Sequence, residues 1–427
     1  MKRLLLLTVS LTASVVLSAP TADNVAVQVS PQGEVRVTYD LLGGEDAVVT
    51  MQVEGSDGSV LSPTLVFGDV NRVVSSGTGK SLSWRASSEC VGLLDDRAVV
   101  TLTAHPLSDL PLYCAVDLSR RDGAGLAGLE FFANSNAVPE GVGAWRWKTT
   151  HMLFRKIPPT GPDGYRMGTP SDEPLAYNPT DASKIYDKPH TVVLTKPYYI
   201  GVYETTISQW QSATGTTPTN SMAVILTREY LTAPAHDLSY QAIRGSNKGL
   251  LWPASSEVDA DSFLGIFRQN TGLSFDLPTD AQWEYACRAG TTGPYYAPGA
   301  TEDVLSSIAR HGGNRTSGFY VAADKKRYWF NFVGTYAPNA WGLYDMLGNV
   351  WELARDRFQM DISSPATQTD PKGPATGDAF VIRGGGYSEP YAPRSNDGLA
   401  VKCSVRYGEP ATFAYQNIGV RLALDLD

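Results

Sequence analysis

The stretch that most constrains the fold is residues 339–352, which read N-A-W-G-L-Y-D-M-L-G-N-V-W-E. Two tryptophans, a tyrosine and two acidic residues stand here beside two glycines, Gly342 and Gly348. The aromatic residues recur at neither the helical nor the strand period, and the glycines interrupt both. Such a stretch is typical of a loop-rich core segment that is buried through its rings and held by its polar groups. We expect the chain after about residue 150 to pack around it.

Before residue 107 the sequence has the pattern of an all-β domain. Alternating apolar and polar runs, such as residues 47–53 and 98–103, are separated by turn residues. Strands spaced in this way are typical of an antiparallel sandwich. We predict a fibronectin-like or immunoglobulin-like β-sandwich over residues 24–106, followed by a connector over residues 107–150. The sandwich carries no polar constellation that suggests chemistry, which favours a role as a spacer or docking module.

Residues 1–19 read as a secretory signal. Lys2 and Arg3 give a positive start, an apolar run follows, and Ser18-Ala19 ends it with small residues suited to cleavage. The alternative is a transmembrane anchor, but the run is short and contains Thr and Ser residues. No other apolar run approaches the ~18 residues that would span a bilayer. We expect an exported protein, periplasmic or secreted, with no membrane span after signal cleavage.

Charge and motif content exclude several functions. The chain has 35 Lys and Arg residues against 44 Asp and Glu residues, a formal net charge of −9. Without an extended basic cluster, no nucleic acid is expected as a partner. The five histidines are scattered and give no metal-binding spacing, and there is no G-x-S-x-G nucleophile motif.

The four cysteines are Cys90, Cys114, Cys287 and Cys403. In an oxidising compartment an even number suggests two disulfides, and four cysteines allow three pairings. Cys90 and Cys114 are close in sequence and are predicted to pair, with free thiols as the alternative. The chain has no C-x-x-C motif, so neither a zinc site nor a thioredoxin-type site is indicated.

The region after residue 150 predicts an α+β domain with few helices and long loops. Its clearest helix lies in the run 277–290, where Thr279 and Gln282 form a capping box and Gly290 is the stop. Trp283, Ala286 and Cys287 share one face of it, which we expect to be buried. Other expected elements are two shorter helices over 207–212 and 259–269, and strands over 151–157, 198–203, 380–382 and 418–424.

Five motifs occur in a fixed order, at residues 199–206, 277–290, 339–352, 383–387 (R-G-G-G-Y) and 417–421 (N-I-G-V-R). Together they resemble the formylglycine-generating enzyme family, also called the sulfatase-modifying factor family. The resemblance covers residues 151–424 and implies a loop-rich α+β domain related to C-type lectins. Residues 24–106 lie outside it.

The resemblance also implies where the chemistry would be. Active members of the family convert a sulfatase cysteine to formylglycine, using oxygen and a copper ion held by two thiolates. In the family these thiolates stand five residues apart, between the R-G-G and N-x-G-x-R motifs. Counting back by fives from Cys403 places them at Gly398 and Pro393, neither of which can bind copper through sulfur. The catalytic cysteine pair is therefore missing, no catalytic residue is assigned, and copper is not expected as a cofactor.

The resemblance gives Cys403 a structural role instead. In some members the matching cysteine forms a disulfide with the cysteine of the W-E-Y-x-C helix, which is Cys287 here. The alternative is that Cys287 and Cys403 themselves form a copper-binding pair.

A calcium site is implied within the opening stretch. The ligands implied by position are two side-chain carboxylates and two backbone carbonyls, those of Asp345, Glu352, Gly348 and Val350. These are the hard oxygen ligands that Ca²⁺ prefers. The alternative is that the two acids cap neighbouring backbone or pair with Arg355 or Arg383. A second family calcium site would fall within 309–323, but the match there is poor and it is not assigned.

Two functions from different classes follow. The first is a non-catalytic, calcium-stabilised binding module for a peptide, a glycan or a partner protein. Its candidate contacts are loop aromatics, with burial as the alternative for most of them: Tyr295, Tyr296, Tyr320, Tyr387 and Tyr391. The second is a formylglycine-generating oxidase. The residues at the two thiolate positions favour the first.

Overall fold

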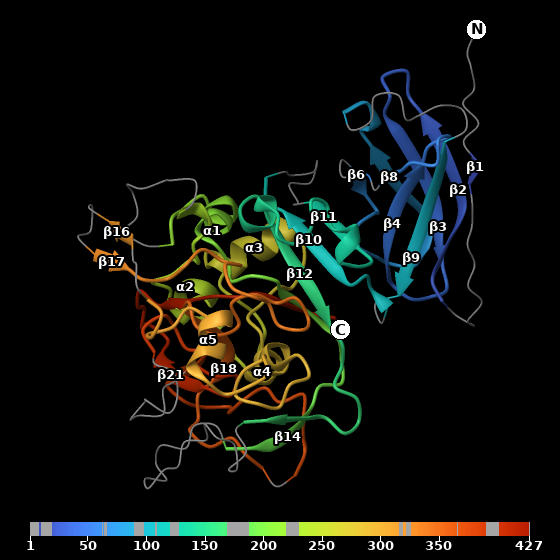
Figure 1. Ribbon diagram of the computed structural model, residues 1–427. Helices are drawn as coiled ribbons and strands as arrows, with labels where there is room; N and C mark the ends of the chain where they lie inside the picture. The colour runs from blue at the N-terminus through green and yellow to red at the C-terminus, as the bar shows by residue number, and fades with distance from the viewer. Residues whose placement is uncertain are drawn as a thin grey trace, which may run out of the picture. The chain divides into compact units, whose positions relative to one another are not determined.

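The computed structural model describes residues 8–9, 19–61, 63, 66–88, 98–106, 109–119, 128–168, 188–218, 230–315, 319–321, 326–364, 366–389 and 401–426 (Figure 1). The contacts divide the chain into two compact units, Met1–Val138 and Pro139–Leu426. Each unit has its own core. Among the residues just given, no helix is both long and apolar enough to cross a membrane.

The N-terminal unit is made of strands in two sheets. The first has the order β2 (Thr21–Val29), β3 (Val35–Leu42), β8 (Gly77–Trp84) and β6 (Val66–Gly68). The second has the order β1 (Thr8–Val9), β9 (Val99–Pro106), β4 (Ala47–Glu54) and β5 (Val60–Leu61), and β7 (Val73–Val74) also pairs with β4. The unit also contains a hairpin of β10 (Tyr113–Asp117) and β11 (Gly128–Phe132), and its described residues include the 3-10 helices η1 (Ala86–Ser88) and η3 (Ser135–Ala137).

The core of this unit follows from residue alternation. Along β3 the side chains of Val35, Val37, Tyr39 and Leu41 are buried while those between them are exposed or half-buried. A strand directs successive side chains to opposite faces, so such a pattern buries one face of a sheet. The unit is all-β, and a fibronectin or immunoglobulin type for it stays a prediction. The hairpin and η3 fall in the stretch predicted as a connector.

The C-terminal unit contains several small sheets. One has the order β12 (His151–Ile157), β15 (Tyr198–Gly201), β23 (Ala423–Asp425). A second has the order β21 (Arg406–Pro410), β20 (Ala379–Arg383), β18 (Trp351–Arg357), β22 (Ile418–Gly419). A third has the order β13 (Tyr165–Met167), β14 (His190–Val193), β19 (Gln368–Thr369), and a hairpin joins β16 (Phe319–Val321) to β17 (Lys326–Tyr328).

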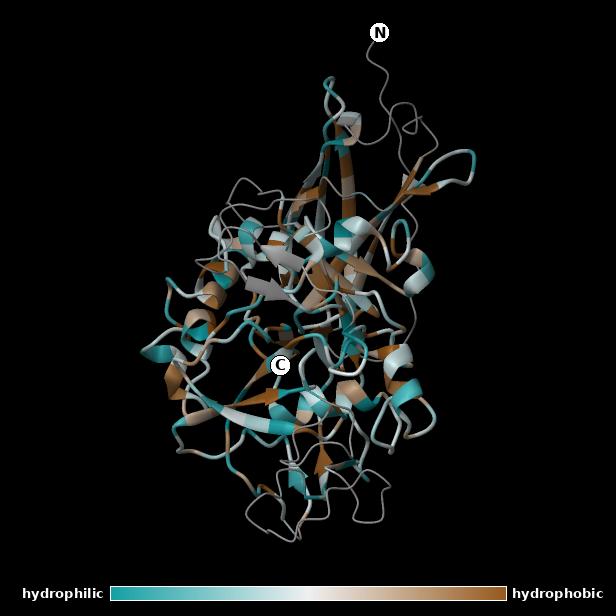
Figure 2. Ribbon diagram, turned by 60° about the vertical axis from the view of Figure 1, so that its left-hand side comes forward, coloured by the Kyte–Doolittle hydropathy of each residue, from teal (hydrophilic) through white to brown (hydrophobic). Residues whose placement is uncertain are grey.

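The helices of this unit are short. They are α1 (Ile207–Thr214), α2 (Tyr240–Arg244), α3 (Phe263–Thr271), α4 (Asp280–Arg288) and α5 (Glu302–Ile308), with 3-10 turns η4 (Trp145–Lys148), η6 (Tyr230–Thr232) and η7 (Lys248–Leu251). Helices coloured by hydropathy carry both brown and teal residues, as expected for helices that bury one face (Figure 2). The unit is an α+β domain, as the sequence predicts.

Local capping explains where the helices begin and end. The capping boxes of α1 and α4 form as their sequences predict, with Thr279 and Gln282 exchanging hydrogen bonds at α4. Helix α4 ends one residue earlier than predicted, at Arg288, because Ala289 already takes the left-handed conformation. Helix α3 begins four residues later than predicted. Asp259 accepts backbone hydrogen bonds from Asn247 and Lys248, and Ser262 caps the helix instead.

Helix α4 lies at the centre of the main core of this unit. Its Trp283, Ala286 and Cys287 are fully buried, which confirms the predicted face. They pack in one cluster with Met346 and Leu347 of the 339–352 stretch, as well as with residues of β12, β14 and β15. The stretch is therefore part of the core and packs against α4.

Candidate functional site

The 339–352 stretch is attached to the C-terminal end of α4 by one amide side chain. Asn339 Nδ2 donates to the carbonyls of Ala286 (2.7 Å) and Cys287 (3.1 Å), while its Oδ1 accepts from the backbone N–H groups of Trp341 and Leu343. The last carbonyls of a helix have no partner within the helix, so this side chain satisfies groups that would otherwise be buried and unpaired. The contact fixes the start of the stretch on the helix.

Four residues in this stretch have positive φ: Gly342, Asp345, Gly348 and Asn349. Gly348 has φ +74°, and a Cβ there would lie 2.1 Å from the Arg310 carbonyl oxygen. Only glycine fits such a position. Asp345 has φ +55°, which Asp tolerates better than most residues. Its carboxylate accepts from the Gly334 backbone N–H at 2.5 Å, and burial raises the pKa of Asp345 to about 6.

Glu352 has a full set of partners. Arg421 Nε lies 3.0 Å from both carboxylate oxygens, and Arg421 Nη2 lies 2.6 Å from Oε1. The Trp283 indole N–H donates to Oε2 at 2.6 Å. All three side chains are buried. A guanidinium that meets a carboxylate in this way neutralises it and fixes its orientation.

Arg421 is the cation shared by several buried acids. It pairs with Glu352, and it holds down the pKa of both Glu204 and Asp345, which burial raises. Glu204 in turn accepts from Asn349 Nδ2 (2.6 Å) and from the Val350 backbone N–H (3.2 Å). The stretch is therefore held by an internal positive charge supplied from the end of the chain.

This arrangement does not fit the predicted calcium ligands. A calcium ion at Glu352 would have to displace Arg421, and an ion at Asp345 would compete with the Gly334 N–H for the carboxylate. Neither Arg355 nor Arg383, the alternatives, pairs with these acids. Arg355 pairs with Asp276 and Asp425, and Arg383 with Asp280 and Glu284. Calcium binding through Asp345, Gly348, Val350 and Glu352 stays a prediction, and its test is given below.

Sequence reasoning did not identify Arg421 as the partner of Glu352. The two residues are 69 positions apart, and no local pattern links them. The one sequence signal for this pair was the N-I-G-V-R motif. Its arginine lies among apolar residues, in the strand predicted over 418–424, and would need a buried carboxylate as its partner.

Cys287 and Cys403 lie together as buried thiols. Burial and a hydrogen bond with Cys403 raise the pKa of the Cys287 thiol well above its ordinary value, and the thiol also contacts the Met346 carbonyl at 3.7 Å. A raised pKa disfavours the thiolate that binds metal. The pair therefore fits a structural role better than a copper site. Cys114 is a buried thiol of the N-terminal unit, and Cys90 lies outside the described residues.

The residues at the two thiolate positions, Pro393 and Gly398, also lie outside the described residues. Their side chains contain no sulfur in any conformation, so they do not fit a copper ion. No chemical step is assigned to copper in this chain.

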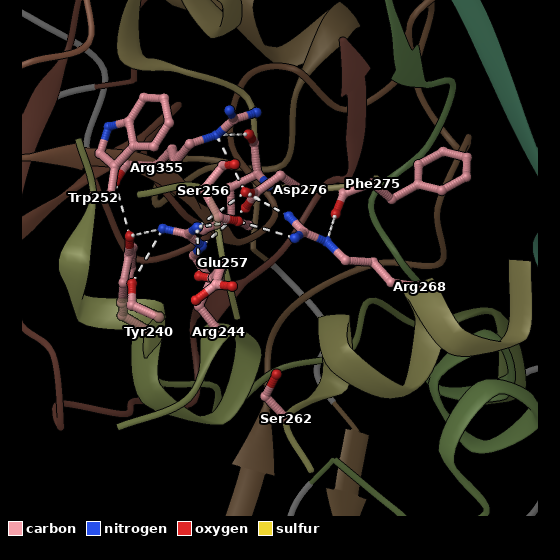
Figure 3. Close-up of polar contacts among 12 residues, drawn as sticks. Tyr240, Arg244, Trp252, Ser256, Glu257, Ser262, Arg268, Phe275, Asp276 and Arg355 are labelled. Atoms are coloured by element: carbon pink, nitrogen blue, oxygen red, sulfur yellow. Dashed lines mark hydrogen bonds and ion pairs between the residues drawn. The ribbon is translucent and has the colours of Figure 1, made fainter. Parts of the chain in front are cut away.

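A second polar cluster surrounds Asp276. The guanidinium groups of Arg244, Arg268 and Arg355 converge on this one carboxylate (Figure 3), with Arg244 Nε 3.0 Å and Arg268 Nη2 2.8 Å from it. Other donors of these guanidinium groups reach backbone carbonyls, among them those of Ser256 and Phe275, while Arg244 Nη1 donates to the Tyr240 hydroxyl and Arg355 Nη1 pairs with Asp425. Asp276 and Arg244 are fully buried, so this cluster ties α2, α3 and β18 together and exposes no reactive group.

A cavity of about 490 Å³ opens beside the first turn of α4. Its wall comes from β13, α4, β18, β19 and β21 and from residues 359–363 and 371–374 between these strands. The charged side chains that line it are Asp280, Asp356, Arg357, Asp361, Lys372 and Arg406. The volume suits a small ligand, and the mixture of charges suits a polar one.

Most of the loop aromatics proposed as contacts are buried. Tyr295, Tyr296 and Tyr387 are 1%, 6% and 2% exposed, so the alternative of burial holds for these three. The side chains of Tyr320 and Tyr391 lie outside the described residues. The sequence did not single out the cavity, because its wall comes from segments more than two hundred residues apart.

The chain is similar to known proteins over the C-terminal unit. Residues 164–426, more than half of the chain, match the family described as Sulfatase-modifying factor enzyme 1-like domain. Formylglycine-generating enzyme of Thermomonospora curvata is 38% identical over 117 residues, covering 26% of this chain and 38% of the relative. Formylglycine-generating enzyme of Mus musculus is 31% identical over 197 residues, covering 45% and 50%.

Another mouse relative is named Inactive C-alpha-formylglycine-generating enzyme 2 and is 30% identical over 154 residues, covering 34% of this chain and 42% of the relative. The chain thus spans half or less of the length of these relatives. Among solved structures, Treponema denticola variable protein 1 has a TM-score of 0.45 at 24% identity, covering 64% of this chain and 95% of that one. PvdO from Pseudomonas aeruginosa has a TM-score of 0.44 at 22% identity, covering 64% and 94%.

Proposed function

This chain belongs to the sulfatase-modifying factor family, and on that basis we propose that it is a non-catalytic binding member of the family. The observation that carries the proposal is the residue content at the two thiolate positions, Pro393 and Gly398. Copper chemistry of the family type needs two thiolates, and this chain has none there. The matched region contains only two cysteines, Cys287 and Cys403, and both are buried.

The cavity beside α4 supports a binding role. It is large enough for a small molecule, and neither Cys287 nor Cys403 lines it. A domain with the family core but without the two thiolates can still bind a ligand through its other residues. An N-terminal signal, with export to the periplasm or the medium, belongs to the same proposal. A peptide, a glycan or another protein remains the partner class to be distinguished.

The second candidate is a formylglycine-generating oxidase. It is favoured by the names of several relatives, which are formylglycine-generating enzymes. For this chain it would require the Cys287–Cys403 pair to bind copper. Burial of both thiols and the raised pKa of Cys287 argue against that.

Turnover of a sulfatase peptide separates the two. The full chain is incubated with copper, oxygen and a peptide that contains C-x-P-x-R, and formylglycine is sought by mass spectrometry. We expect no aldehyde. Formation of formylglycine that disappears in Cys403→Ser would establish the oxidase and reject the binding role.

A further inference from the structure

The cavity beside α4 has most of its charged groups already committed to other parts of the protein. Asp280 pairs with Arg383 and with Arg406, whose Nη2 lies 2.8 Å from it. The Arg357 guanidinium donates to the carbonyls of Trp252, Leu250 and Gly377. Asp361 pairs with Lys188 at 3.1 Å. These charged groups form part of the wall, but their partners within the protein leave them less able to pair with a ligand.

Two ionisable groups on the wall make no ion pair among the described residues. Asp356 is 1% exposed and accepts from the Asp280 backbone N–H and from the Trp252 indole at 3.4 Å, but it makes no ion pair there. The Lys372 ammonium likewise pairs with no carboxylate in that part of the chain. It lies 5.8 Å from the centre of the Trp252 ring, an indole that also donates to the Lys372 carbonyl at 2.9 Å. Both groups thus lie beside the same tryptophan, Asp356 at its indole N–H and Lys372 near its ring.

A small recess continues the cavity and contains a free acceptor. The recess shares Met167, Ile362 and Arg406 with the cavity, and His190 lines it. His190 is 4% exposed, and its Nδ1 lies 3.1 Å from the Lys188 carbonyl, to which it must donate. In the neutral ring Nε2 is then an acceptor, and it is buried with no partner among the described residues. A buried acceptor without a donor carries a free-energy cost that a ligand donor would remove.

We propose that this cavity binds a small zwitterionic molecule, a free amino acid or a short peptide, whose ammonium pairs with Asp356 and whose carboxylate pairs with Lys372. A further N–H or O–H of the ligand would donate to His190 Nε2. The proposal rests on the binding role proposed above and names the ligand class for it. A ligand with one charge only would leave either Asp356 or Lys372 without its partner.

Charge and size both support this ligand class. A polyanion is disfavoured because three carboxylates line the cavity, and a polycation because three basic side chains do. A volume of about 490 Å³ suits a molecule of a few residues rather than a folded partner. Burial, together with the neighbouring Asp280, raises the pKa of Asp356 to about 7, although Arg355 acts to lower it. An ammonium group would supply the missing counter-charge, so binding should strengthen as the pH rises through this value.

Calorimetry of the full chain with a panel of free amino acids and alanyl dipeptides tests the proposal. At least one member is expected to bind, and the N-acetylated and the C-amidated forms of that member should each bind about tenfold more weakly or worse, a loss of roughly 1.4 kcal/mol. The affinity should also fall between pH 8 and pH 6. Equal binding of the capped forms, or no binding by any member at about 10 mM, where a 1 mM complex would be nearly saturated, would overturn the proposal.

Matched variants place the ligand in this cavity. Asp356→Asn and Lys372→Gln should each weaken the bound member by about tenfold, the size of a lost charge pair with its hydrogen bonds. Glu257→Gln and Lys248→Gln, which alter an exposed ion pair outside the cavity, should leave binding unchanged. Unchanged binding in both cavity variants, with melting temperatures like that of wild type, would reject this site.

The two proposals fail in different ways. If no zwitterion binds and the sulfatase peptide is not converted, only the ligand class is wrong. If the peptide is converted to formylglycine, the binding role is wrong whatever the calorimetry shows.

Discussion

At the scale of single residues, the buried charges decide how the family domain of this chain is held together. Arg421 stands among Glu204, Asp345 and Glu352, and the carboxylate of Glu352 is bound by Arg421 and by Trp283. Burying a charge is costly unless it is paired and hydrogen-bonded. The Arg421 guanidinium is therefore a positive charge shared by several buried carboxylates. Two of them, Asp345 and Glu352, are the acids predicted to bind calcium.

Removal of the Arg421 guanidinium should lower the free energy of unfolding strongly. Arg421→Met leaves Glu352 buried without its ion pair, and loss of one member of a buried pair typically costs about 3–5 kcal/mol. We expect urea unfolding to show a loss of this size. The control is Lys188→Met, which removes an exposed pair with Asp361 and should change stability by less than about 1 kcal/mol. Equal losses in both variants would contradict the role given to Arg421.

Asp356 should make stability depend on pH. Burial raises the pKa of this carboxyl to about 7 in the folded chain, from its ordinary value of 3.8. The folded state therefore favours the protonated form, and the associated stability is lost as the pH rises from about 4 through 7. A shift of one unit corresponds to about 1.4 kcal/mol, so the effect between pH 5 and pH 8 is on the order of 2 kcal/mol.

The test is a series of melting curves for Asp356→Asn and wild type from pH 5 to pH 8. The variant should lose less stability over this interval, because its amide does not titrate. Asp345 and Glu204 titrate in both proteins and cancel in the comparison. Parallel curves for the two proteins would show that Asp356 is not perturbed by burial.

At the scale of elements, the 339–352 stretch acts as a clamp between α4 and β18. Asn339 binds the last carbonyls of α4, Gly348 passes within contact of the Arg310 backbone, and Trp351 begins β18. The stretch is a buried loop that continues directly into β18. It is fixed at both ends by protein groups, Asn339 on α4 and Trp351 in β18.

Calcium provides the test of this element. Because Arg421 already neutralises Glu352, the melting temperature of wild type should be the same with calcium as with a chelator. A rise of several degrees in calcium that is absent in Asp345→Ala would contradict this expectation and restore Asp345, Gly348, Val350 and Glu352 as ligands. Magnesium serves as the control for a general effect of divalent ions.

Elements with local signals could be predicted, and contacts across the chain could not. Residues close together in the sequence give the capping boxes of α1 and α4 and the alternation in β3. These three elements form at the predicted places. The predicted start of α3 was wrong. The Asp259 side chain accepts hydrogen bonds from the backbone N–H groups of Asn247 and Lys248, and the apolar periodicity of the sequence gives no sign of these contacts. The site was less predictable still, because its pairing of Glu352 with Arg421 joins positions 69 apart.

At the scale of the whole molecule, the chain joins an all-β unit to a family domain whose thiols are buried. The two cysteines of the domain lie side by side, so in an oxidising compartment they are placed to form one disulfide. This bond would close a loop of more than a hundred residues. In the chain-entropy model such a loop contributes about 4–5 kcal/mol to stability.

Peptide mapping without reductant tests this pairing. After export, Cys287 is expected in a disulfide with Cys403, and Cys90 with Cys114. Reduction should lower the urea midpoint of the family domain. Linkage of Cys287 to either cysteine of the N-terminal unit would contradict the predicted pairs.

Titration of the native chain with Cu(I), in competition with a chromophoric chelator, tests the central claim most directly. The claim is that this family member holds no copper and works by binding. The chelator should keep all of the copper, in wild type and in Cys403→Ser alike. One Cu(I) taken from the chelator by wild type, and none by Cys403→Ser, would show that a thiolate copper centre survives and would contradict the account.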